Sequence, residues 1–111
     1  MNITPGRVGG VTNALAIYEV AQKAGIPCWI GGMLESAVGV GYCIALAMLD
    51  NCTYPADIFP SSRFYDQDLA DPPIVLSQSP EGIPTIRALT EFPEPVSDRL
   101  STRTVQTATV H

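Results

Sequence analysis

The stretch Trp29-Ile30-Gly31-Gly32-Met33-Leu34-Glu35-Ser36 joins a short apolar strand to a helix and decides the fold class. Cys28-Trp29-Ile30 is wholly apolar, as is typical of strands buried on both faces in a parallel sheet. The two glycines end this strand, and Ser36 is the predicted N-cap of a helix that runs through Val40, Ile44 and Met48. That helix is apolar nearly all round, which predicts that other elements cover it on more than one side.

A second strand–helix unit precedes this stretch. Asn2-Ile3-Thr4 predicts a short strand, and the segment from Pro5 to Gly10 predicts an ordinary loop. Thr12 is the predicted N-cap of a helix whose apolar residues share one face, namely Ala14, Ile17, Val20, Ala21 and Ala24. Gly25 fits the position just after the end of this helix.

The segment that follows the second helix predicts a third short strand at Asp57-Ile58-Phe59, which gives the alternation typical of βαβ units. Seven of the ten prolines lie from Pro60 onward and exclude long helices there. Pro73–Leu76 and Gly82–Ile86 predict a hairpin with Ser77–Glu81 as its turn, and Thr102–Val110 predicts an edge strand. The predicted fold class is therefore α/β.

Composition narrows the class of protein. The chain has 111 residues, 46% of them hydrophobic and 15% charged, so it can form one modest domain that must bury much apolar surface. The net charge of −5 and the scattered Lys and Arg residues argue against nucleic-acid binding. The longest apolar run, from Ala37 to Leu49, is too short to span a membrane, and no secretory signal is expected.

The cysteines and the histidine limit the possible chemistry. Cys28, Cys43 and Cys52 form no Cys-x-x-Cys pair, so they are interpreted as free thiols in a reducing cytoplasm. The sole histidine is His111, so neither a histidine-based triad nor a histidine metal cluster is expected.

Three segments together resemble one enzyme family. They are Asn2–Gly10, the stretch Trp29–Ser36 with its Gly-Gly-Met-Leu-Glu motif, and Pro55–Ile58 followed by Ser61-Ser62-Arg63-Phe64-Tyr65 and Asp68-Leu69. They are similar to the sixth, seventh and eighth strands of the o-succinylbenzoate synthase and N-acylamino acid racemase group of the enolase superfamily, which includes mandelate racemase and muconate lactonizing enzyme. The resemblance implies that residues 1–70 are the last three strands of a (β/α)7β TIM-like barrel. Residues 71–111 are then a return segment toward the capping domain.

The resemblance also implies a mechanism. Such enzymes use Mg²⁺ to bind a substrate carboxylate and to stabilise the enolate that forms when an α-proton is removed, with lysines as acid and base. The family's metal carboxylates and its Lys-x-Lys pair belong to earlier strands and would precede Met1. No metal ligand is therefore assigned in this chain, and no cofactor is expected in it. Thr4 stands at the position of the sixth-strand lysine, and a hydroxyl cannot serve as a proton shuttle near pH 7.

The resemblance and the residue types suggest several site residues, each with an alternative. Glu35 is the candidate active-site carboxylate at the mouth of a strand, or a solvated carboxylate that caps the next helix. Gly31, Gly32 and Met33 form a substrate-pocket wall or only a turn, and Phe64 and Tyr65 line the pocket or pack beneath a loop. Asp66 and Asp68 are interpreted as solvated, and Trp29 as core.

The expected function follows the family. The parent activity is dehydration to o-succinylbenzoate in menaquinone synthesis, with a small-molecule carboxylate as substrate. The alternatives are an N-acylamino acid racemase or dipeptide epimerase, and a non-catalytic truncated product or association module. The expected partner is the N-terminal half of the barrel or a second copy of the chain, and the 111 residues alone are expected to be inactive.

Overall fold

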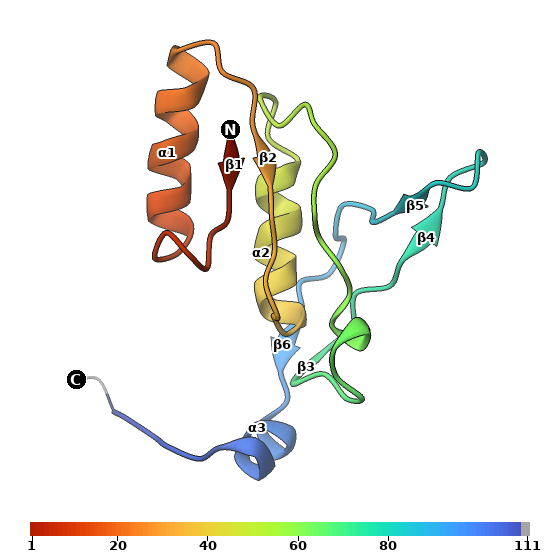
Figure 1. Ribbon diagram of the computed structural model, residues 1–111. Coiled ribbons are helices and arrows are strands. Elements are labelled where there is room, and N and C mark those ends of the chain that lie inside the picture. Colours follow the sequence, from red (N-terminus) through yellow and green to blue (C-terminus); the bar gives the residue numbers. More distant parts are fainter. Residues whose placement is uncertain (110–111) are drawn as a thin grey trace.

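The computed structural model describes residues 1–109. Figure 1 shows β1 and β2 side by side, with helix α1 next to β1 and helix α2 next to β2. The elements in chain order are β1 Asn2–Ile3, α1 Val11–Lys23, β2 Trp29–Ile30, α2 Ala37–Ala47, a 3-10 turn Ser61–Arg63, β3 Ala70–Asp71, β4 Ser77–Gln78, β5 Pro84–Thr85, β6 Glu94–Pro95 and α3 Ser97–Arg103.

The first half has the predicted parallel strand–helix alternation. β1 and β2 are parallel, with Asn2 opposite Trp29 and Ile3 opposite Ile30. The third predicted strand, Asp57–Phe59, is wrong in extent, because it is present only as a single parallel bridge between Gly31 and Asp57. Two hydrogen bonds form that bridge, from Asp57 N to Ile30 O at 2.9 Å and from Gly32 N to Asp57 O at 2.8 Å.

Both predicted helices form, but their N-termini differ from the sequence prediction. Helix α1 begins at Val11 with Gly10 as its N-cap residue, so the prediction of Thr12 as N-cap was wrong. Gly10 has a φ of 113°, which glycine adopts easily, and this turn starts the helix two residues early. Ser36 is the N-cap residue of α2 as predicted, but its side chain makes no capping hydrogen bond.

The end of α1 was predicted correctly. Gly25 has a φ of 70°, and the backbone N–H of Ile26 donates to Ala21 O at 2.9 Å. This is the hydrogen bond that closes a helix through a left-handed glycine.

Helix α2 lies between two apolar clusters, which confirms the prediction of cover on more than one side. It contributes Cys43 and Leu46 to the first and Ala37, Val40 and Ile44 to the second. The first cluster also contains Ile3, Ala14, Tyr18, Ala21, Cys28 and Ile30, and the second Ala70 and Ile74. Trp29 is only half-buried and belongs to neither cluster, so its assignment to the core was wrong.

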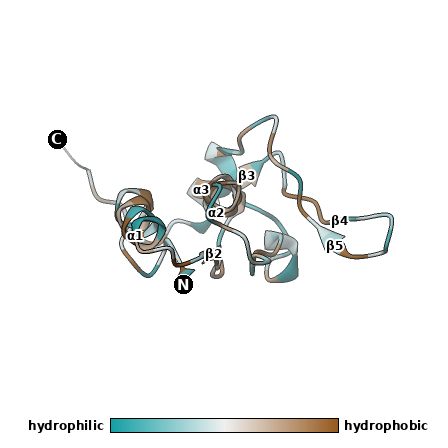
Figure 2. Ribbon diagram, turned by 90° about the horizontal axis from the view of Figure 1, so that it is seen from above, coloured by the Kyte–Doolittle hydropathy of each residue, from teal (hydrophilic) through white to brown (hydrophobic). Residues whose placement is uncertain are grey.

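The predicted hairpin forms with different strands. β4 pairs with β5 in antiparallel register, Ser77 opposite Thr85 and Gln78 opposite Pro84. Ser77 and Gln78 therefore belong to a strand and not to the turn, and Pro73–Leu76 forms no strand. Pro72 and Pro73, before and at the start of this segment, offer no backbone N–H to a ladder, which favours pairing further along the chain, from Ser77. Figure 2 shows the hairpin extending away from helices α1 and α2.

The return segment comes back to the first half through β6 and α3. β3 and β6 are antiparallel, and Val96 N donates to Leu69 O at 2.8 Å. Helix α3 then occupies Ser97–Arg103, and residues 104–109 form no strand. The predicted edge strand over Thr102–Val110 was therefore wrong for its described residues, and Val110 lies outside them. Thr102 instead donates its hydroxyl to Asp98 O at 2.8 Å inside the helix.

Candidate functional site

A groove of about 300 Å³ lies where the carboxyl ends of β1, β2 and the Gly31–Asp57 bridge meet. Loops at this end of parallel strands carry the chemistry of barrel enzymes. The groove is lined by Arg7, Gly32, Met33, Leu34, Glu35, Val40, Asp57, Ile58, Phe59 and Phe64. Gly32, Met33, Glu35 and Phe64, all predicted from the sequence, therefore lie together.

Glu35 is half-buried and holds its carboxylate between two backbone segments. A Cβ added at Gly6 would lie 3.4 Å from Glu35 Oε1, and one added at Gly32 would lie 3.6 Å from Oε2. The thiol of Cys43 donates a hydrogen bond to Oε2 at 3.3 Å. The backbone N–H of Ala37 at the start of α2 donates to Asp68, so the alternative of a helix-capping role belongs to Asp68.

Thr4 and Gly31 contact each other just outside the groove. The Thr4 hydroxyl donates to Asn2 Oδ1 at 2.9 Å, and a Cβ added at Gly31 would lie 3.0 Å from Thr4 Oγ1. A Cβ at position 31 would press against Thr4, so the packing of β1 next to β2 favours glycine here. Neither residue lines the groove.

Phe64 and Tyr65 have different positions. Phe64 is 42% exposed and lines the groove, whereas Tyr65 donates its hydroxyl to Leu34 O at 3.0 Å and faces a second cavity. The two rings meet edge to face with centroids 6.4 Å apart. The second cavity, of about 550 Å³, is lined by Leu34, Ser36, Phe64, Tyr65, Asp66, Gln67, Asp68, Leu69 and Arg103.

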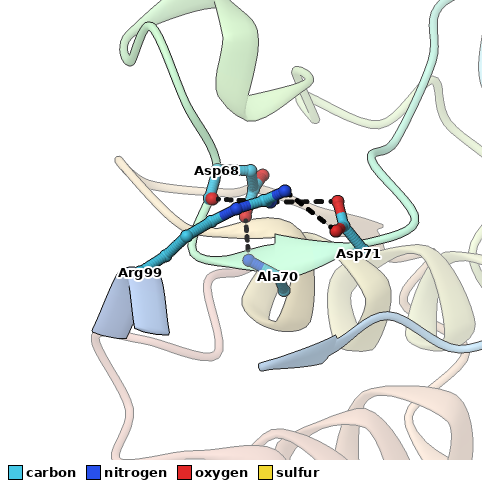
Figure 3. A network of polar contacts seen from close by, with 4 residues as sticks. All are labelled: Asp68, Ala70, Asp71 and Arg99. Atoms are coloured by element: carbon cyan, nitrogen blue, oxygen red, sulfur yellow. Dashed lines mark hydrogen bonds and ion pairs between the residues drawn. The ribbon is translucent and has the colours of Figure 1, made fainter. Parts of the chain in front are cut away.

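Asp68 is half-buried and both of its carboxylate oxygens accept hydrogen bonds, so its interpretation as a solvated loop carboxylate was wrong. Its oxygens accept hydrogen bonds from the backbone N–H of Ala37 and of Ala70, all at 3.0 Å. Arg99 of α3 donates to Asp68 O at 3.2 Å and forms an ion pair with Asp71 at 3.0 Å (Figure 3). These contacts bind the return segment to the loop that carries Phe64.

The sequence interpretation missed two charged residues of the groove, Arg7 and Asp57, and four apolar ones, Leu34, Val40, Ile58 and Phe59. Arg7 lies in the loop after the first predicted strand, and that position was the available signal. Asp57 was predicted at the start of a strand, and the structure brings it to this edge through its bridge to Gly31. The groove thus combines one guanidinium with two carboxyl side chains and the apolar Met33 and Phe64. Such a lining suits a small polar molecule that carries an apolar part.

The thiol beneath the groove has a perturbed pKa. Burial raises the pKa of Cys43 to about 12, and the charge and hydrogen bond of Glu35 contribute in the same direction. The thiol is therefore a protonated donor at neutral pH. It adds no second negative charge next to Glu35.

Among residues 1–109, no three His, Cys, Asp or Glu side chains lie close enough together to hold a metal ion. The described residues alone therefore do not fit a Mg²⁺ site. In the same residues, no helix has the length and apolar character needed to cross a membrane.

Comparisons with known proteins bear on this groove. Residues 1–67 match the family described as the C-terminal domain of the domain of unknown function DUF8230. The chain is 43% identical over 95 residues to an N-succinylamino acid racemase of Amycolatopsis, a match that covers 86% of this chain and 26% of that protein. It is 43% identical over 74 residues to the o-succinylbenzoate synthase of Bacillus subtilis, over 67% of this chain and 20% of that protein.

A solved structure agrees with these relatives. An enolase-superfamily member from Listeria innocua superposes with a TM-score of 0.61 at 41% identity, over 68% of this chain and 20% of that chain. The chain thus spans between a fifth and about a quarter of the length of the proteins it matches. The chain belongs to the family described as the DUF8230 C-terminal domain, and its homologues are the o-succinylbenzoate synthases and N-acylamino acid racemases of the enolase superfamily.

Proposed function

We propose that the chain forms the C-terminal wall of the active site of an o-succinylbenzoate synthase-like enzyme. Residues 1–70 provide the last three βα units of the barrel, and residues 71–111 return toward the capping domain. The observation that carries this proposal is the Glu35 carboxylate in a groove at the carboxyl ends of β1, β2 and the Gly31–Asp57 bridge. Carboxyl groups at this edge of a barrel are placed for chemistry.

Five side chains of the groove have roles in this proposal. The Arg7 guanidinium donates hydrogen bonds to an anionic group of the substrate. The carboxylates of Glu35 and Asp57 accept hydrogen bonds from N–H or O–H groups of the substrate. Met33 and Phe64, 47% and 42% exposed, contact the apolar part of the substrate. Together they orient a small carboxylate substrate and exclude water from one side of it.

The remaining parts of the site come from outside these 111 residues. The Mg²⁺ of the family would bind carboxylates of another segment, since residues 1–109 hold no matching cluster. The partner is therefore the N-terminal part of the barrel, in the same polypeptide or in a second one. We expect that the 111 residues alone neither bind Mg²⁺ at micromolar concentration nor turn over substrate. Titration calorimetry and an o-succinylbenzoate assay against a no-protein control test this.

Thr4 limits the activity further. A hydroxyl cannot exchange protons with a carbon acid near pH 7 as a lysine amine can. Racemisation needs a group on each face of the substrate and should lose more than dehydration, in which abstraction and departure can share one lysine. The 43% identity to the Amycolatopsis racemase over 95 residues nevertheless makes racemisation of N-succinylamino acids the second candidate function.

A chimera tests the proposal. The matching segment of the Amycolatopsis racemase is replaced by this chain, with either Thr4 or Thr4→Lys, and both reactions are assayed. The Thr4 chimera should be slow, and Thr4→Lys should raise its rate by about 10²–10⁴-fold, the typical contribution of general acid–base catalysis. Thr12→Lys, an exposed threonine on α1, is the matched control and should change neither rate.

Two results would contradict the proposal. If the chimera with Thr4 and the chimera with Thr4→Lys are both folded and equally active, Thr4 does not occupy the acid–base position. If the folded Thr4→Lys chimera has no activity on either substrate, the chain does not form this active-site wall, and a role as an association module is favoured.

A further inference from the structure

The Glu35 side chain lies flat on the first turns of helix α2. A Cβ added at Gly39 would lie 3.0 Å from Glu35 Cβ and 3.3 Å from both Cγ and Cδ. Glu35 directly precedes Ser36, the N-cap residue of α2, and its side chain lies against Gly39 in the first turn of the helix. A Cβ at position 39 would come closer to Glu35 than side chains normally pack, so the Glu35 side chain would have to shift by a few tenths of an ångström.

One turn further along the same face, Cys43 contacts the end of the Glu35 side chain. Its thiol is 1% exposed and donates to Glu35 Oε2 at 3.3 Å. With a pKa of about 12, this thiol keeps its proton throughout the neutral range and remains a donor. Gly39 thus lies against the Glu35 side chain from Cβ to the carboxylate carbon Cδ, whereas the thiol contacts one carboxylate oxygen.

We propose that Gly39 and Cys43 are positioning residues for Glu35, and that together they hold its carboxylate at the groove between Gly6 and Gly32. The inference rests on the proposed function insofar as Glu35 contacts substrate. The absence of a side chain at Gly39 lets the Glu35 side chain pack directly on α2, and the Cys43 thiol orients the carboxylate through its hydrogen bond. Without either residue, the Glu35 carboxylate is free to turn toward solvent.

The first test uses the 111-residue chain and needs no activity. Alkylation by iodoacetamide at pH 8 is followed separately at Cys28, Cys43 and Cys52 by peptide mass spectrometry. Burial raises the Cys43 pKa most and the Glu35 charge raises it further, so Glu35→Gln should lower this pKa and raise the Cys43 rate. The rise should be roughly threefold for each pKa unit, because the thiolate fraction grows while its nucleophilicity falls. Glu19→Gln, which removes an exposed charge on α1, is the control.

Gly39→Ala should raise the Cys43 alkylation rate in the same way, because it displaces the carboxylate. Its matched control is Gly41→Ala, where a Cβ would also lie 3.0 Å from its nearest neighbour, but that neighbour is Phe92. Cys28 is buried as fully as Cys43, so its alkylation rate rises if a variant destabilises the whole fold. If Glu35→Gln and Gly39→Ala leave the ratio of Cys43 to Cys28 rates unchanged, the proposal is wrong.

The second test places Gly39→Ala, Cys43→Ala and Cys43→Ser in the Thr4→Lys chimera. The two alanine variants should lower kcat/KM by about 10–100-fold, as small misplacements of a site group do. Serine retains a donor and should restore most of the rate, whereas Gly41→Ala and Cys28→Ala should stay close to the parent. Equal kcat/KM in all variants of an active chimera overturns the positioning role. An inactive chimera whose Cys43 still responds to Glu35→Gln contradicts the proposed function and leaves the geometry of Gly39, Cys43 and Glu35 supported.

Discussion

Both carboxylate oxygens of Asp68 accept a hydrogen bond from the backbone N–H of Ala37, each at 3.0 Å. A residue 31 positions along the chain thus caps helix α2, a role that the adjacent Ser36 does not fill. The cap also sets the loop that carries Phe64 against the start of the helix that carries Gly39 and Cys43. The candidate site and the C-terminal loop are therefore connected through one carboxylate.

Asp68→Ala should lower the free energy of unfolding by about 1–2 kcal/mol, the usual effect of removing a helix cap. Asp68→Asn keeps an acceptor oxygen and should lose less. Urea unfolding followed by circular dichroism measures both, with Asp66→Ala as the exposed neighbouring control. Equal stability of Asp68→Ala and Asp66→Ala would show that the cap does not contribute.

Arg99→Lys should loosen helix α3. The Arg99 guanidinium reaches both Asp71 oxygens and Asp68 O at 3.0–3.2 Å, a forked geometry that an ammonium group cannot reproduce. The Asp71 side chain is 53% exposed, so the effect on global stability should stay below about 1 kcal/mol. Amide hydrogen exchange should nevertheless be faster in Ser97–Arg103 and unchanged in α1. Arg87→Lys is the control. If the amides of Ser97–Arg103 exchange at the same rate in Arg99→Lys as in Arg87→Lys, this prediction is wrong.

Stability should fall as the pH rises above 9. The pKa of Cys43 is raised in the folded chain from 9.0 to about 12, because burial and then Glu35 disfavour the thiolate. The thiol's contribution is therefore fully present below pH 9 and is lost between pH 9 and 12. Unfolding midpoints from about pH 7 to 10.5, a range that starts below the unfolded pKa, should fall more steeply for the unmodified chain than for Cys43→Ala. Parallel curves for the two proteins would refute this assignment.

The apolar surface where helix α1 meets Met1 and Ile26 should drive self-association. It forms an apolar surface hollow of about 320 Å³ lined by Met1, Ala16, Ile17, Val20, Ala21, Ala24 and Ile26, with Val20 70% exposed. Exposed apolar patches of this kind mark interaction sites. Val20→Lys should shift sedimentation profiles at tens of micromolar protein toward monomer, whereas Thr12→Lys on the same helix should not. A monomeric parent chain would contradict the expectation of an unfilled barrel edge.

The sequence by itself determined the order of the first elements and the group of residues at their carboxyl ends. Short apolar strands, glycines after them and amphipathic or apolar helices are local patterns, so Asn2–Ile3, α1, Trp29–Ile30 and α2 could be predicted. The family resemblance of three segments, added to these patterns, predicted Gly32, Met33, Glu35 and Phe64 as site residues, and all four line one groove. Parallel strands joined by helices end on the same side, which is why the segments that follow them meet.

Tertiary structure decided which side chain meets which partner. Asp68 caps α2 in place of Ser36, Gly10 starts α1 in place of Thr12, and Tyr65 turns away from the groove that Phe64 lines. Tertiary structure also brings the Cys43 thiol to 3.3 Å from Glu35 Oε2, with the Glu35 side chain packed against Gly39. Strand and helix periodicity depends on neighbours a few residues apart, whereas a hydrogen bond across 31 positions depends on how two elements pack. Only the packed chain brings the Ala37 nitrogen and the Asp68 oxygens to 3.0 Å from each other.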